Sequence, residues 1–104
     1  MGIEVEWVDE DHNVIQEVSD SKQHVSALAT RQWPCLQDTV CLRFIGPFGD
    51  CVFNQAQIPI LLNELNRSAE SLTDPETRAH VAQVCRLVAT AMGQPHTYIK
   101  FVGD

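Results

Sequence analysis

Apolar and acidic residues alternate at the start of the chain. Ile3, Val5 and Trp7 fall on one face of an extended segment, and Glu4 and Glu6 fall on the other. A period of two residues is typical of a strand with one face in a core and the other in water. The pattern therefore predicts a strand over residues 3–8 whose glutamates face solvent.

A polar run, Asp9–Asn13, separates this segment from the apolar stretch Val14–Val18. Asp and Asn favour turns because their side chains bond nearby backbone N–H groups, so the three segments predict a β-hairpin. The polar run also has the spacing that opens a calcium-binding loop. However, Val14 occupies the position that requires glycine, and no helical pattern precedes the loop. A plain turn is favoured.

Two later segments have the 3.6-residue period of amphipathic helices. The first follows Asn54, a good N-cap residue. Its apolar stripe comprises Ile58, Leu61, Leu62, Leu65, Ala69 and Leu72. The second is capped by Thr73 or Asp74, has Pro75 in its first turn and ends at Gly93. Its stripe comprises Val81, Val84, Cys85, Val88 and Met92. The short link between the helices predicts antiparallel neighbours.

Further strands are expected where β-branched and aromatic residues cluster. They cover Thr39–Ile45, Cys51–Phe53 and His96–Val102. Gly46–Asp50 supplies a turn between the first two, with Gly49 available for a positive φ.

A short helix is also expected after a cap at Ser19–Ser21. It ends at Trp33, because Pro34 disfavours a helical conformation in the residue before it. The predicted order is β-β-short α-β-β-α-α-β, in one domain over residues 1–104. We expect an α+β fold, with an antiparallel or mixed sheet of about five strands and an antiparallel helical hairpin packed on one face.

Residues 41–46 are echoed at the end of the chain by residues 98–103. The similarity predicts two similar strands. Alternation along the first of them directs Phe44 toward the helices and leaves Cys41 and Ile45 on the opposite face.

The same alternation predicts the composition of the outer sheet face. Arg43, Tyr98 and Lys100 are expected there, together with Glu4 and Glu6. Opposite charges on adjacent strands form cross-strand pairs, which explain the two cations without a ligand. The functional alternative is that Arg43 and Lys100 bind an anion or a partner.

Charge is distributed unevenly along the chain. The formal net charge is −7, and residues 1–20 hold seven Asp or Glu and no Lys or Arg. This acidic segment repels nucleic acid and phosphate surfaces, and it can either steer a basic partner or keep the protein in solution. A pI near 4.9 and the lack of a basic cluster argue against nucleic-acid binding. No apolar run reaches the ~20 residues of a membrane span, so a cytoplasmic protein is expected.

The four cysteines lack the close pairs that a metal site requires. Motifs for phosphate binding and for hydrolytic catalysis are also absent from the sequence. We therefore expect a non-enzymatic protein without a cofactor. The enzymatic alternative is a Cys51 nucleophile with His96 as its base, near Asp50, and it requires thiol and imidazole within hydrogen-bond reach.

Small size and an acidic N-terminal segment together favour a protein-binding module. An inhibitor, an immunity-type protein or a regulatory adaptor with a basic protein partner fits this description, because aromatic residues ringed by charge are common interface anchors. The predicted partner-binding residues are Glu4, Glu6, Glu10, Trp33, Arg43, Phe48, Tyr98 and Lys100. A structural subunit that forms a homodimer through its strand edges is the alternative.

Overall fold

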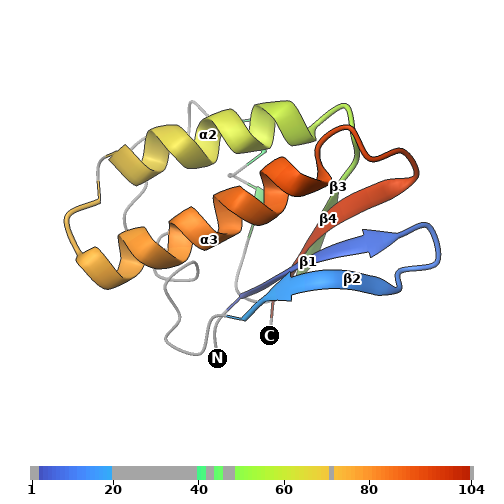
Figure 1. The fold of residues 1–104 in the computed structure, drawn as a ribbon, viewed down its shortest axis with the longest axis horizontal. Coiled ribbons are helices and arrows are strands. Elements are labelled where there is room, and N and C mark those ends of the chain that lie inside the picture. Colours follow the sequence, from blue (N-terminus) through green and yellow to red (C-terminus); the bar gives the residue numbers. More distant parts are fainter. Residues whose placement is uncertain (1–2, 20–39, 42–43, 46–48, 71, 104) are drawn as a thin grey trace.

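The protein is built on one antiparallel sheet with helices on one face (Figure 1). The computed structural model describes residues 3–19, 40–41, 44–45, 49–70 and 72–103. The strands are β1 (Glu4–Asp9), β2 (Val14–Val18), β3 (Asp50–Phe53) and β4 (Thr97–Val102). They lie in the order β2-β1-β4-β3, so the N-terminal and C-terminal strands are neighbours at the centre.

Helices α2 (Ile58–Glu70) and α3 (Pro75–Ala91) lie side by side and run in opposite directions (Figure 1). Helix α3 contacts β1, β2 and β4. The fully buried side chains between sheet and helices include Ile3, Val5, Phe53, Ile58, Leu61, Val81, Val84, Val88, Ile99 and Phe101. The predicted α+β architecture with a helical pair on one face is confirmed at this level.

Local signals mark the start of both helices and the end of α3, as predicted. Asn54 and Gln57 form a reciprocal cap before α2: the Asn54 N–H donates to Gln57 Oε1 at 2.9 Å, and the Gln57 N–H donates to Asn54 Oδ1 at 3.1 Å. Helix α3 begins with Asp74 as its N-cap and Pro75 in its first turn. After α3, Gly93 adopts φ +84°, the left-handed conformation that favours glycine.

The polar run between β1 and β2 forms the expected turn. Asp9 Oδ1 accepts from the backbone N–H groups of Asp11 and Asn13, both at 2.9 Å. The Asp9 N–H in turn donates to the Asn13 carbonyl at 3.0 Å. The side chain and the backbone of Asp9 thus both hold the turn.

The prediction of a strand over Thr39–Ile45 is wrong for the residues that the structure describes. Val40, Cys41 and Ile45 lie outside any strand, and Phe44 lies in a short 3₁₀ turn whose N–H donates to the Cys41 carbonyl. Burial is also the reverse of the prediction: Cys41 and Ile45 are 1% and 4% exposed, whereas Phe44 is 63% exposed. The described residues therefore form four strands rather than about five.

A buried carboxylate accounts for this departure. Glu64 of α2, only 5% exposed, accepts the N–H of Val40 at 2.6 Å and that of Cys41 at 3.0 Å. These two N–H groups are satisfied by a helix side chain, so they do not need a strand partner. The tertiary contact overrides the β propensity of the segment.

Three smaller expectations also need correction. Met92 is 42% exposed because α3 ends at Ala91 and Met92 is an extended C-cap, so the buried stripe ends with Leu87, Val88 and Ala91 instead. Gly49 does not adopt a positive φ. Trp7 is half-buried rather than fully within the core. The short helix expected between Ser19 and Trp33 lies outside the described residues.

We expect the Asp9 turn to make stability depend on pH. Its bond from the Asn13 backbone N–H is the largest cause that lowers the pKa of Asp9. A carboxyl whose pKa is lower in the folded state contributes stability above the unfolded pKa, and that contribution disappears as pH falls through the folded pKa. Asp9→Ala should therefore be less stable than the original protein at pH 7, by a difference that shrinks below about pH 4.

The measurement for Asp9 is the urea midpoint of unfolding between pH 7 and pH 3. Asp11→Asn removes a charge from the same turn without removing an acceptor of these bonds, and it should follow the original protein at every pH. A stability difference for Asp9→Ala that is constant with pH would contradict this role of the carboxylate.

Candidate functional site

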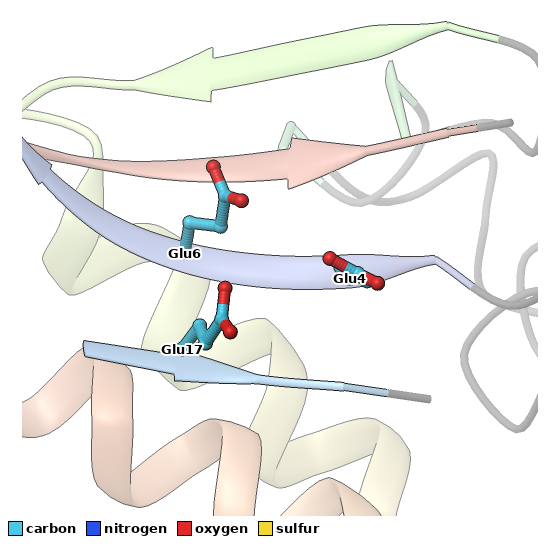
Figure 2. Close-up of side chains that lie close together, drawn as sticks. All are labelled: Glu4, Glu6 and Glu17. Carbon is cyan, nitrogen blue, oxygen red and sulfur yellow. The ribbon is translucent and has the colours of Figure 1, made fainter. Parts of the chain in front are cut away.

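Three glutamates converge on the sheet face opposite the helices. Glu6 of β1 is in register with Glu17 of β2, and Glu4 lies two residues before Glu6 on the same face. One carboxylate oxygen from each residue lies within 4.8 Å of the other two. Figure 2 shows the three side chains on the same side of β1 and β2. Glu4, Glu6 and Glu17 are termed the acidic surface below.

A β-bulge in β2 creates this arrangement. Trp7 is in register with Gln16 and Val8 with Val14, so Ile15 is an extra residue without a partner on β1. A regular hairpin with the same turn would place Glu17 opposite Val5, on the core face. Because of the extra residue, each later side chain of β2 points to the opposite face of the sheet. Val18 therefore lies opposite Val5, and Glu17 lies opposite Glu6.

No ion pair within residues 3–19 and the other described ranges neutralises the acidic surface. Lys100 of β4 is in register with Glu6 of β1, so both lie on the outer face of the sheet, as predicted. Its ion pair, however, is with Asp50 of β3, at 3.8 Å. Like charges directly opposite one another destabilise a sheet. A positively charged group that is not among the described residues would therefore relieve the repulsion between the carboxylates of the acidic surface.

The residues that we predicted as a partner site are only partly brought together. Tyr98 and Lys100 lie on the outer face of β4, beside β1 and its Glu4 and Glu6. Trp33, Arg43 and Phe48 lie outside the described residues. Glu17 was not among the predicted residues, because alternation alone does not reveal a bulge of one residue.

Glu10 lies away from the acidic surface, at the turn end of the hairpin. Its Oε1 is 2.6 Å from Nδ1 of His96, which precedes β4 and adopts φ +61°. Both side chains are exposed, at 59% and 77%. Glu10 thus links the hairpin turn to the start of β4, and it is separate from Glu4 and Glu6.

The cysteine and histidine of the enzymatic alternative are far apart. Cys51 is in register with Phe101, five residues further along β4 than His96, which corresponds to about 16 Å at the rise of a strand. Burial raises the pKa of the Cys51 and Cys85 thiols. Burial, with a contribution from Glu64, raises the pKa of Cys41 to about 11. A raised pKa disfavours the thiolate that a nucleophile requires.

Two of the open cavities are lined by described residues alone. One, of about 290 Å³, lies between the start of α2 and the start of β4 and is lined by Asn54, Gln55, Ala56, His96, Thr97 and Tyr98. Its Gln55 side chain already bonds Ala91, Gly93 and Thr97. The other, of about 330 Å³, separates β2 from α3.

Among the described residues, no helix combines the length and the apolar character needed to cross a bilayer.

The comparisons with known proteins do not identify a relative. A scan against protein-family models, a search of curated proteins and a search of solved structures found no match.

Proposed function

We propose that the protein is a non-enzymatic binding module that recognises a basic protein partner through the acidic surface. The observation that carries this proposal is the convergence of Glu4, Glu6 and Glu17 within 4.8 Å, on the sheet face opposite the helices. A carboxylate cluster that has no ion pair among the described residues attracts Lys and Arg side chains, and the net charge of −7 adds long-range steering toward a basic surface.

Exposed apolar side chains on the two outer strands add support for an interface. Val14 and Ile15 of β2 are each 47% exposed, and Val52 of β3 is 41% exposed. A patch that combines apolar area with charge at its rim is typical of protein interfaces. Val52 is in register with Lys100, so the outer face offers both kinds of contact across the sheet.

Self-association through strand edges is a second candidate function. Both outer strands, β2 and β3, lack a second strand partner among the described residues, and they carry the exposed Val14, Ile15 and Val52. Free edges are ready templates for pairing with another chain. However, two copies that each carry a charge of −7 repel one another, so a basic partner is favoured.

Affinity capture with matched charge variants tests the proposed function. The immobilised protein is compared with a Glu6→Gln, Glu17→Gln double variant and with an Asp11→Asn, Glu70→Gln double variant. Both variants lose two negative charges, but only the first alters the acidic surface. Because the first variant removes a like-charge contact, it should fold at least as well as the original protein.

The expected result is a basic protein that the original chain and the second variant retain and that the first variant releases. Raising the salt concentration should weaken its retention, because exposed charges are screened. If all three proteins retain the same material, or if none retains a basic protein, the proposed function is wrong.

A further inference from the structure

Strand β2 has a free edge in the described part of the chain. It ends the sheet, and among the described strands it pairs with β1 alone. Val14, Ile15, Gln16 and Glu17 are all exposed. Such a strand presents a row of backbone N–H and C=O groups that can accept another strand.

A groove runs between this edge and the helix beside it. The cavity of about 330 Å³ is lined on the β2 side by Gln16, Glu17 and Val18. On the α3 side it is lined by Gln83, Arg86, Leu87 and Thr90. Leu87 is buried in the core, whereas Gln16, Gln83 and Arg86 are exposed. The apolar side chains of Val18 and Leu87 thus lie beside amide, guanidinium, hydroxyl and carboxylate groups.

The charges on the two sides of β2 differ in sign. Glu17 lies on the outer face with Glu6 and also reaches the β2 rim of the groove, while Arg86 lines the groove on the helix side. Within the described ranges Arg86 makes no ion pair. Successive side chains of an added strand point alternately to these two sides, so each side selects its own kind of residue.

We propose that the partner binds by strand addition, with an extended segment pairing along the edge of β2 in this groove. Its outward side chains are Lys or Arg and meet Glu17 and Glu6. Its inward side chains are acidic or amide and meet Arg86 and Gln83. Strand addition beside a helix is an established way to bind peptides, in which backbone bonds provide affinity and alternate side chains provide specificity. This inference rests on the proposed function and deepens it.

A second copy of the chain fits this groove less well. A neighbouring β2 strand would bring another Glu17 to the same edge, beside three carboxylates that already repel one another. A segment with alternating basic and acidic residues instead matches both sides of β2. The occupant is therefore a segment of a different protein.

Titration with a pair of octapeptides tests the inference. The first alternates lysine and glutamate, and the second has the same composition with all lysines before all glutamates. Both are capped at their ends and have no net charge, so simple attraction to an acidic protein does not distinguish them. Binding is followed by the amide chemical shifts of the full chain.

The alternating peptide should shift the amides of β2 and of residues 83–90 in α3, and the block peptide should bind several-fold more weakly. Arg86→Ala should weaken the alternating peptide about five-fold, the effect of one lost hydrogen bond of ~1 kcal/mol. Arg67→Ala, which removes an exposed cation from α2, should leave its affinity unchanged.

Three results would overturn strand addition. Equal binding of the two peptides would show attraction to charge alone, and the proposed function would survive. Absence of shifts in β2 with either peptide would remove the groove as the site, again without affecting the capture experiment. Protection of the β2 amides that rises with protein concentration, without peptide, would identify a second copy as the occupant.

Discussion

Deletion of Ile15 is expected to lower the free energy of unfolding by about 3 kcal/mol or more. Without the extra residue, the hairpin returns to a regular register in which Glu17 faces the core opposite Val5 and Val18 faces out. The chain must then either bury a carboxylate or detach β2 from α3, and both outcomes belong to the severe class of changes. Urea unfolding measures the loss.

The control for this deletion is Ile15→Ala. The side chain of Ile15 is 47% exposed, so its truncation should cost less than about 1 kcal/mol while the bulge remains. A deletion that is no more damaging than Ile15→Ala would mean that register, and with it the acidic surface, does not depend on the bulge.

Glu64→Ala is expected to destabilise the protein by about 3 kcal/mol. The carboxylate accepts the N–H groups of Val40 and Cys41 in a buried position. Its removal leaves these donors without that acceptor. The bond from Cys41 is buried and the bond from Val40 is partly buried, and a buried donor left unsatisfied costs about 1–3 kcal/mol. Glu70→Ala, at the exposed end of the same helix, should stay within about 0.5 kcal/mol of the original protein.

Alkylation of Cys41 gives a local readout of the same change. The thiol is 1% exposed, and its pKa is raised to about 11, so it should react slowly with iodoacetamide at neutral pH. Glu64→Ala should accelerate its labelling under native conditions by freeing the backbone around it. Unchanged labelling together with unchanged stability would contradict the role of Glu64 in holding this segment.

The helices and the central strands were predictable because their signals are local. The Asn54–Gln57 cap, the Asp74–Pro75 start and Gly93 each act within a few residues. Alternation of Glu4 and Glu6 with buried neighbours likewise predicted β1 and its outer face. Such features follow from the chain itself, so they do not require knowledge of the tertiary structure.

Local sequence signals do not predict the conformation of residues 40–45. Their sequence resembles that of β4, yet β4 is a strand with β1 and β3 on either side, whereas Val40 and Cys41 bond a helix carboxylate. Whether a segment of high β propensity becomes a strand depends on which acceptor reaches its N–H groups. That contact spans more than 20 residues of sequence, so no local pattern indicates it.

The candidate site was predictable only in part for a related reason. Glu4, Glu6 and Lys100 were placed correctly on the outer face, because they follow simple alternation. Glu17 joins them through one extra residue in β2. A bulge changes the face to which the following side chains point, but it leaves no clear mark in the sequence, because Ile15 is compatible with either register.

The most direct test of the bulged register is the pattern of cross-strand nuclear Overhauser effects in the β1–β2 hairpin. The acidic surface and the groove beside it both depend on the bulged register. We expect backbone contacts that pair Glu6 with Glu17 and Trp7 with Gln16. Contacts that pair Glu6 with Gln16 and Val5 with Glu17 would place Glu17 on the core face and contradict the account.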